Sequence, residues 1–210
     1  MQVDSPVLLV LAGPNGAGKS TMAPRYIQKS GVGEFVNADE IAKGISAFHP
    51  ESVALKAGQM ALERMSELRQ SRKSFAIETT LAARTYVGMI KAMREEGYLV
   101  RLVYVWLQTP ELAIRRVADR VRSGGHHIED GVVRRRYQAG LDNLFDLYIP
   151  LVDEWVVCDG SSVQGAQMVA SGCFDVAQMI YEPKLWEAVK HGVSKQFWLR
   201  ESPLDGGDPE

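Results

Sequence analysis

Short apolar runs alternate along the chain with longer segments whose apolar residues recur at helical spacing. Five of the runs have the length of strands, over residues 7–12, 34–37, 75–78, 99–107 and 155–158. The first of them is continuously apolar, as expected for a parallel strand covered on both faces. The segments between them predict helices over residues 18–29, 51–72, 86–96, 110–121 and 131–148. This alternation is typical of an α/β fold of the P-loop NTPase type, with a parallel sheet of about five strands and helices on both faces.

The C-terminal part of the chain departs from this alternation. Two moderately apolar runs within residues 166–181, separated by Ser171-Gly172, predict an antiparallel hairpin appended to the sheet. A final helix is predicted over residues 183–198, with Pro183 in its first turn. Residues 201–210 have the Gly, Pro and Asp content of a disordered tail. We therefore expect one domain over residues 1–200, followed by that tail.

Composition narrows the function classes. The 210 residues include 46% hydrophobic and 24% charged residues, as in ordinary soluble domains. The net charge of −2 supplies no excess positive field, so a nucleic-acid partner is not expected. Cys158 and Cys173 have no metal-ligand spacing, which favours a reducing cytosol. The first apolar run is too short for a signal segment or a membrane span, so we expect a cytoplasmic protein without a membrane partner.

A glycine-rich segment directly follows the first predicted strand. It reads Gly13-Pro14-Asn15-Gly16-Ala17-Gly18-Lys19-Ser20 and continues with Thr21. In the pattern G-x-x-x-x-G-K-[ST], backbone N–H groups curl around phosphate, the lysine reaches the β- and γ-phosphates, and the serine hydroxyl binds Mg²⁺. The bland alternative is an ordinary glycine-rich turn, but the strand before and the helix after favour the P-loop. We therefore expect bound ATP or GTP with Mg²⁺ held by Ser20.

Two carboxylates follow other predicted strands, at the edge of the sheet where ligands bind. Asp39 comes 20 positions after Lys19 and is expected opposite the γ-phosphate, where it could accept the proton of an attacking hydroxyl. The alternative is that Asp39 only caps a helix beginning near Glu40. Glu78 ends the third strand and could bind the substrate or the second shell of Mg²⁺, against a purely structural hydrogen-bonding role.

Arginines cluster on both sides of Gly124-Gly125. Seven occur within 22 positions, namely Arg115, Arg116, Arg120, Arg122, Arg134, Arg135 and Arg136. Residues 115–137 therefore resemble the mobile lid of small kinases, whose arginines neutralise charge on the transferred phosphoryl group. The alternative is a solvated helix face. No strand ends in a typical Walker B pair, and neither an LSGGQ-type signature nor Asn-Lys-x-Asp is present, so transporter ATPases and switch GTPases are less favoured than a kinase.

Taken in order, several segments resemble the zeta-toxin family. They read GPNGAGKST at 13–21, VNADEIA at 36–42, AIETTLA at 76–82, PELAIRRVADRVRSGGH at 110–126 and RRRYQAGLDNL at 134–144. The resemblance implies a P-loop kinase and a parallel α/β fold. Characterised members phosphorylate the 3′-hydroxyl of the sugar in UDP-N-acetylglucosamine. Their partner is a small helical antitoxin that occludes the nucleotide site.

The same resemblance implies roles for individual residues. Lys19 and Ser20 match the phosphate and Mg²⁺ residues, and Asp39 matches the aspartate proposed as base. Arg120 matches the lid arginine near ATP. The family has a second lid arginine, and we assign this role to Arg136.

The predicted substrate site departs from the family pattern. Glu78 matches the substrate-binding glutamate, with Thr80 in the same loop. Where toxins of known activity tend to read Glu-Gly-Thr-Gly-Arg, this chain reads Glu-Thr-Thr-Leu-Ala, and Arg84 is the nearest arginine. This departure puts the identity of the acceptor in doubt more than the kinase chemistry.

Three functions remain open from the sequence. The first is a kinase that transfers the γ-phosphate to a hydroxyl of a small molecule, for example a nucleotide sugar. The second is a nucleotide-dependent switch that binds ATP and changes its affinity for a partner without a metabolite acceptor. The third is a polynucleotide-end kinase, which the arginines allow and the acidic pI of about 6.1 does not favour.

Overall fold

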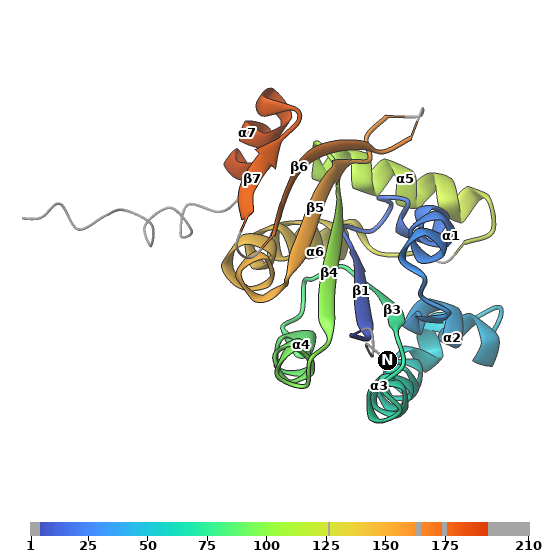
Figure 1. Cartoon of the computed structure of the whole chain (residues 1–210). Coiled ribbons are helices and arrows are strands. Elements are labelled where there is room, and N and C mark those ends of the chain that lie inside the picture. Colours follow the sequence, from blue (N-terminus) through green and yellow to red (C-terminus); the bar gives the residue numbers. More distant parts are fainter. Residues whose placement is uncertain (1–4, 126, 163–164, 174–175, 193–210) are drawn as a thin grey trace, which may run out of the picture.

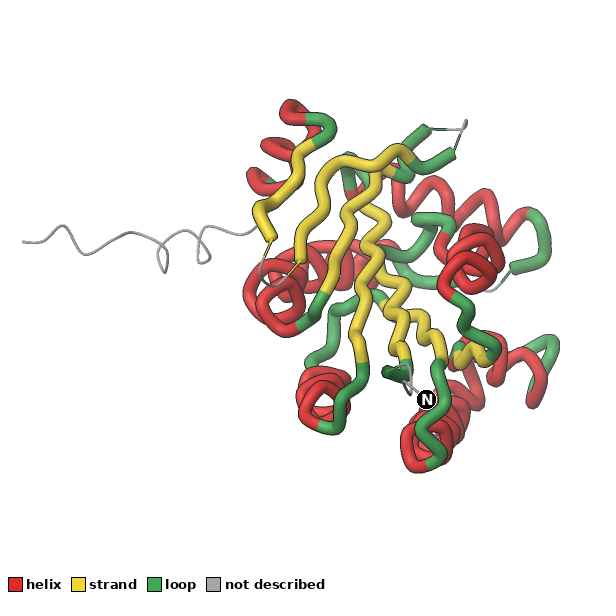
Figure 2. The backbone as a smooth tube through the Cα atoms, viewed as in Figure 1, coloured by secondary structure: helices red, strands yellow, loops and turns green. Residues whose placement is uncertain are grey.

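A seven-stranded sheet forms the centre of the structure, a computed structural model that describes residues 5–125, 127–162, 165–173 and 176–192 (Figures 1 and 2). Its strands lie in the order β2-β3-β1-β4-β5-β6-β7. They span β1 Val7–Ala12, β2 Glu34–Val36, β3 Phe75–Thr79, β4 Leu99–Trp106, β5 Glu154–Asp159, β6 Gln167–Cys173 and β7 Val176–Ile180.

Strand pairing confirms both parts of the predicted sheet. The five strands from β2 to β5 in this order pair in parallel, while β5 with β6 and β6 with β7 pair antiparallel. The appended hairpin is therefore present, but Ser171 and Gly172, predicted to separate its two runs, lie within β6 and pair with β5. In the register between β1 and β3, Leu11 lies beside Glu78. Glu78 consequently lies at the carboxyl-terminal end of the parallel strands, where β1 continues into the glycine-rich segment.

Helices cover both faces of the sheet. The α-helices are α1 Lys19–Ser30, α2 Ala38–Ile45, α3 Ala54–Gln70, α4 Thr85–Glu95, α5 Pro110–Arg122, α6 Asp130–Asn143 and α7 Pro183–His191. Three shorter turns are η1 Pro50–Val53, η2 Leu144–Tyr148 and η3 Ile149–Leu151. Among the described residues no helix is long and apolar enough to cross a membrane.

The side chains of β1 alternate between two cores, as the period of a strand requires. Leu8 and Val10 lie in the larger core with residues of α3, α4 and α6, whereas Leu9 and Leu11 lie in a smaller core with Ala23 of α1. A strand covered on both faces must be apolar throughout, which explains its continuous hydrophobic run. The rigid β1 thus fixes the start of the glycine-rich segment.

Two predicted helices have different bounds in the structure. The helix predicted over 51–72 is a 3₁₀ turn, η1, followed by α3. The helix predicted over 131–148 stops at Asn143 and changes to the π turn η2. This change accompanies hydrogen bonds from Asn143 Nδ2 to Leu81 O, at 2.7 Å, and from Tyr148 Oη to Ala83 O, at 3.1 Å. The loop after β3 is thereby attached to α6 and η2.

The end of the chain lies largely outside the described residues. Helix α7 ends at His191, so the predicted continuation over residues 193–198 is not among them. The predicted tail over residues 201–210 also lies outside them. The single domain over residues 1–200 stays a prediction.

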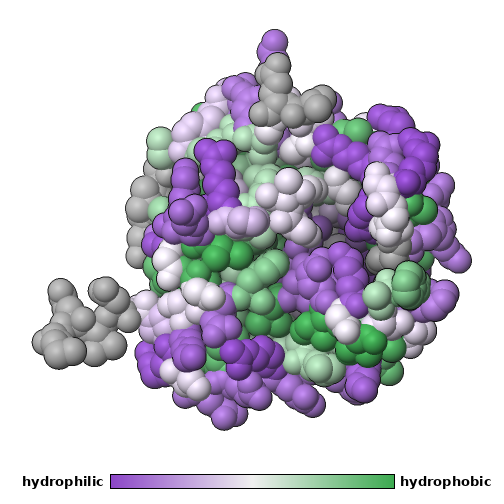
Figure 3. All heavy atoms as spheres, turned by 90° about the vertical axis from the view of Figure 1, so that its right-hand side faces the viewer, coloured by the Kyte–Doolittle hydropathy of each residue, from purple (hydrophilic) through white to green (hydrophobic). Residues whose placement is uncertain are grey.

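Figure 3 shows the face formed by α1, α2 and α5, where polar residues predominate. Apolar side chains gather in its lower part, at the level of α2 and α3 in Figure 1. Two large apolar side chains between these helices and at the start of α3 are highly exposed, Phe48 by 92% and Leu55 by 80%. Keeping apolar side chains of this size in water is unfavourable, so Phe48 and Leu55 are candidates for contact with a partner.

Candidate active site

The glycine-rich segment forms a closely packed loop between β1 and α1. Gly13 has a φ of 139°, and a Cβ there would lie 2.3 Å from Val105 O, so only glycine fits. Gly18 caps α1 in the left-handed region with a φ of 85°. The loop thus turns directly into a helix N-terminus, the local arrangement that binds phosphate through main-chain N–H groups.

Lys19 is buried at the start of α1, with 7% of its surface exposed. Its Nζ donates to Pro14 O at 3.0 Å and lies 3.7 Å from Glu78 Oε1. Burial lowers the pKa of Lys19, nearby Glu78 and Asp39 act in the opposite direction, and Arg120 adds to the lowering. A buried cation in this environment is stabilised by an anion, because a phosphate would offset its lost hydration.

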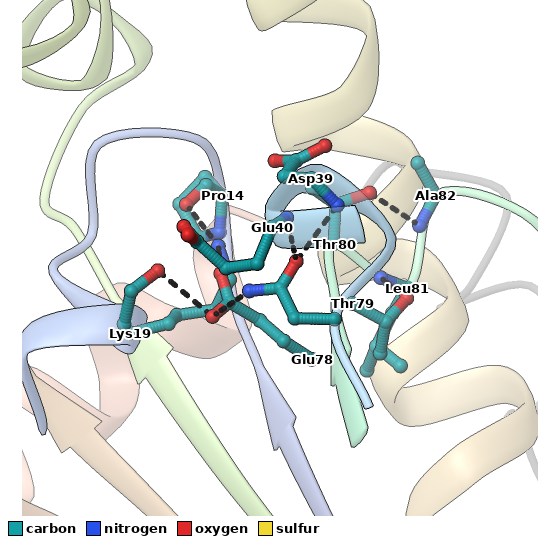
Figure 4. Close-up of polar contacts among 11 residues, drawn as sticks. Pro14, Lys19, Asp39, Glu40, Glu78, Thr79, Thr80, Leu81 and Ala82 are labelled. Atoms are coloured by element: carbon teal, nitrogen blue, oxygen red, sulfur yellow. Dashed lines mark hydrogen bonds and ion pairs between the residues drawn. The ribbon is translucent and has the colours of Figure 1, made fainter. Parts of the chain in front are cut away.

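Three polar side chains converge on the carboxylate of Glu78 at the end of β3 (Figure 4). Ser20 Oγ donates to Glu78 Oε2 at 2.8 Å, and Asn37 Nδ2 donates to the same oxygen at 3.0 Å. Lys19 approaches the other oxygen. The predicted Mg²⁺ hydroxyl and the predicted acidic residue are therefore direct neighbours.

Asn37 holds the first turn of α2 in place. Its side-chain oxygen accepts from the backbone N–H of Asp39 at 2.8 Å and of Glu40 at 3.4 Å. The alternative interpretation of Asp39 as the cap of this helix is wrong, since Asn37 has that role. Sequence reasoning missed Asn37, although an asparagine before Ala-Asp-Glu is a recognisable capping signal.

Asp39 lies exposed on the first turn of α2, beside the glycine-rich loop. Its carboxylate is near enough to Lys19 to raise the lysine pKa. Asp39 follows β2 and Glu78 lies at the end of β3, and because these strands are neighbours, both carboxylates come close to the Lys19 ammonium. With its backbone N–H engaged by Asn37 and its side chain exposed, Asp39 is able to receive a proton from a bound molecule.

Thr80 and Arg84 lie in the loop after β3, farther along the chain from this cluster. Thr80 Oγ1 accepts from Ala82 N at 3.4 Å, and Gly140 of α6 packs against Thr80 O, where a Cβ would approach to 2.3 Å. Arg84 is exposed at the start of α4. Among the described residues, the hydrogen bonds around Glu78 include neither of them.

The predicted lid consists of the end of α5, a connecting segment and the start of α6. Arg120 is exposed on α5 and near enough to Lys19 to lower the lysine pKa. Gly125 follows the helix and donates its N–H to Arg120 O at 2.8 Å. Arg136 on α6 is half-buried. Among the arginines of this segment, Arg120 is therefore close enough for its charge to act on Lys19.

The other arginines of this region have different surroundings. Arg134 forms an ion pair with Glu111, and Arg122 forms one with Asp119. Arg116 donates to the carbonyl oxygens of the loop after β5. Arg115 and Arg135 are exposed. The seven arginines were grouped as one lid from the sequence, but Arg116, Arg122 and Arg134 bind different partners in the structure.

The donor set fits a nucleotide with a hard divalent cation. The cradle of the loop and the buried Lys19 suit a triphosphate, and the Ser20 hydroxyl beside the Glu78 carboxylate offers oxygen ligands, which Mg²⁺ prefers. Among the described residues no group of three or more His, Cys, Asp or Glu could hold a metal ion. Mg²⁺ bound here would thus rely on phosphate and water oxygens in addition to protein, as is usual for nucleotide sites.

Comparison of sequences places the chain in a family. Residues 8–144 match the AAA domain family AAA_33, a span that contains the loop, both carboxylates and the arginine-rich segment. The chain belongs to this family. A relative in Haemophilus influenzae, an uncharacterized protein, is 31% identical over 125 residues, which are 60% of this chain and 88% of the relative.

Solved structures share the fold at low sequence identity. A chain of the AvrRxo1-ORF1:AvrRxo1-ORF2 complex with sulphate ions has a TM-score of 0.71 at 17% identity, over 88% of this chain. This chain spans 63% of that neighbour's length, which is under two thirds. The same complex with ATP gives a TM-score of 0.69 at 18% identity, again over 88% of this chain and 63% of the other.

A chain of the PezAT chromosomal toxin-antitoxin system of Streptococcus pneumoniae has a TM-score of 0.60 at 15% identity, over 96% of this chain and 90% of the other. The predicted α/β fold of the P-loop type, with a mostly parallel sheet and antiparallel C-terminal strands, is thereby confirmed.

Proposed function

We propose that this protein is an ATP-dependent kinase of the zeta-toxin type, which transfers the γ-phosphate to a hydroxyl group of a small molecule. The observation that carries the proposal is the convergence of Lys19, Ser20 and Asn37 on Glu78, with Asp39 beside them. A P-loop alone binds nucleotides in many protein classes. A second, exposed carboxylate next to the buried lysine is what a kinase requires and a simple switch does not.

In this proposal each residue has a defined task. The main chain of residues 13–18 and the Lys19 ammonium hold the β- and γ-phosphates. Ser20 and Glu78 hold Mg²⁺, Ser20 by its hydroxyl and Glu78 directly or through water. The ion supplies charge neutralisation at the β- and γ-phosphate oxygens when it is bound. Arg120 and, from α6, Arg136 neutralise charge on the phosphoryl group during transfer.

Asp39 acts on the acceptor. Its carboxylate accepts the proton of the acceptor hydroxyl as the oxygen of that hydroxyl forms a bond to the γ-phosphorus. The bond between the γ-phosphorus and the bridging oxygen of the β-phosphate breaks, and ADP leaves. The proton on Asp39 then passes to solvent, which the exposed position of this residue permits.

The acceptor would bind beside the loop that follows β3. The loop with Thr80 and Arg84 follows Glu78, and its attachment to α6 through Asn143 keeps it in one position for a substrate. UDP-N-acetylglucosamine is the first acceptor to test because of the family resemblance. GTP is included as an alternative donor, since the P-loop does not read the base.

The proposal extends to a protein partner and a cellular location. AvrRxo1-ORF1 forms a complex with AvrRxo1-ORF2, and the PezAT neighbour belongs to a toxin-antitoxin system. We therefore include a small helical antitoxin as a partner, for which the exposed Phe48 and Leu55 offer an apolar contact surface. The proposed site of action is the cytoplasm, where ATP and nucleotide sugars are available.

The experiment that tests the proposal uses the purified protein, Mg²⁺ and γ-labelled ATP with a metabolite extract, and with UDP-N-acetylglucosamine in a separate reaction. The expected result is label on a small molecule, absent with Lys19→Ala, which removes the charge at the β- and γ-phosphates. Lys29→Ala at the exposed end of α1 is the control for loss of a positive charge. Release of inorganic phosphate alone, without a labelled acceptor, would favour the nucleotide-dependent switch.

A further inference from the structure

Asn37 and Glu78 lie side by side because β2 and β3 pair in parallel. In their register Val36 lies beside Ile77, so the next residues along the two strands, Asn37 and Glu78, follow at the same level. Both are withdrawn from water, Asn37 with 6% of its surface exposed and the Glu78 side chain with 11%. A buried amide and a buried carboxylate both need hydrogen-bond partners, and here each is a partner of the other.

Capping of α2 accounts for only one end of the Asn37 amide. Its Oδ1 accepts from the backbone N–H groups of Asp39 and Glu40, a task that serine, threonine or aspartate also performs at the start of a helix. Its Nδ2 donates to Glu78 Oε2 at 3.0 Å, which requires an amide of this length. The contact with Glu78 is therefore what an asparagine supplies here and another capping residue does not.

The donors around the Glu78 carboxylate differ in what a bound nucleotide would ask of them. Among the described residues these donors are Lys19, Ser20 and Asn37. In the proposed function the Lys19 ammonium holds the β- and γ-phosphates, and the Ser20 hydroxyl is shared with Mg²⁺. The Asn37 amide is neutral and is fixed on the backbone of α2, so its bond to Glu78 is the contact that a nucleotide leaves unchanged.

We propose that Asn37 is a positioning residue, which keeps the Glu78 carboxylate directed at the Mg²⁺ site while a nucleotide is bound. It acts through Glu78, in the way that outer hydrogen-bonding partners orient the ligands of metal ions. Because the same amide holds the backbone N–H of Asp39, it also joins the proposed proton acceptor to the metal side of the site. The inference rests on the proposed function in one respect, that the P-loop binds ATP with Mg²⁺.

The test uses variants that keep the helix cap and lose the donor to Glu78. Asn37→Ser and Asn37→Thr retain an acceptor for the N–H groups of α2, but their hydroxyls are too short to reach Glu78. Calorimetry measures the affinity for ATP in Mg²⁺ and in EDTA, and chemical denaturation checks that each variant is folded. We expect the ratio of these two affinities to fall about ten-fold, while the affinity in EDTA stays within about two-fold of wild type. Lys43→Ala, in the exposed last turn of α2, is the control and leaves both affinities unchanged.

A double variant separates an effect through Glu78 from a general loss of structure. If Asn37 acts through Glu78, adding Asn37→Ser to Glu78→Gln lowers the ratio no further. Additive losses would overturn the proposal, and so would equal losses in Mg²⁺ and in EDTA, which would assign Asn37 to the folding of α2 alone. A wild-type ratio in both Asn37→Ser and Asn37→Thr would overturn it as well. Wild-type protein that binds no ATP, or binds it equally with and without Mg²⁺, contradicts the proposed function itself, and that result is seen before any variant is made.

Discussion

Ser20 Oγ donates to Glu78 Oε2 over 2.8 Å, which connects the first turn of α1 to the end of β3. The two residues are 58 positions apart in the sequence. Because a serine hydroxyl and a carboxylate are both oxygen ligands, the pair defines where Mg²⁺ would bind beside the phosphates. Lys19 on the other oxygen of Glu78 joins the phosphate and metal parts of the site.

Glu78→Gln keeps the shape of this side chain and removes its charge. We expect the Mg²⁺ concentration needed for half-maximal ATP turnover to rise about ten-fold or more, since a neutral amide is a poorer partner for a divalent cation. A titration of turnover with Mg²⁺ measures this. Glu154→Gln on the far end of β5 is the control, and an unchanged Mg²⁺ requirement in Glu78→Gln would exclude Glu78 from the metal site.

Arg120→Ala tests the lid. We expect kcat to fall on the order of 10³-fold with a smaller effect on ATP affinity, because the arginine charge matters most when charge develops on the transferred group. Steady-state kinetics and calorimetry on the same preparation measure both. Arg122→Ala, on the same helix and paired with Asp119, is the matched control. A kcat within a few-fold of wild type would make Arg120 an ordinary surface residue.

Asn37→Ala removes the cap of α2 and the amide that contacts Glu78. We expect a loss of about 1–2 kcal/mol in the free energy of unfolding, because the helix loses its capping acceptor and a buried hydrogen bond disappears. Chemical denaturation measures the change. Asn37→Asp keeps an acceptor for the N–H groups of Asp39 and Glu40 and is expected to retain part of the capping. Equal stability of Asn37→Ala and wild type would contradict the capping role.

Local patterns predicted most of the fold. The continuous apolar run of β1, the glycine spacing after it and the alternation of strands and helices are properties of neighbouring residues, and each is present in the structure. The antiparallel pair β6 and β7 was also predicted from two short runs. Helix ends were less accurate, because Asn143 and Tyr148 bind the loop after β3, and a tertiary contact has no periodic signal.

The sequence identified the residues of the candidate site better than it predicted the contacts between them. Lys19 and Ser20 were identified from the glycine-rich motif, and Asp39 and Glu78 from their positions near strand ends, which meet on one side of a parallel sheet. Which arginine faces which partner could not be predicted. Arg116 and Gly160 are 44 positions apart, and only the packing of α5 against the segment after β5 brings them together.

Asp39→Asn tests the central claim most directly, because it keeps the size of the side chain and removes its ability to accept a proton. The measurement is transfer of label from γ-labelled ATP to the small-molecule acceptor, made alongside ATP affinity on the same preparation. The account predicts a loss of transfer of roughly 10²-fold or more with unchanged ATP affinity, in the range usual for a general base. Full transfer with normal ATP binding would contradict it.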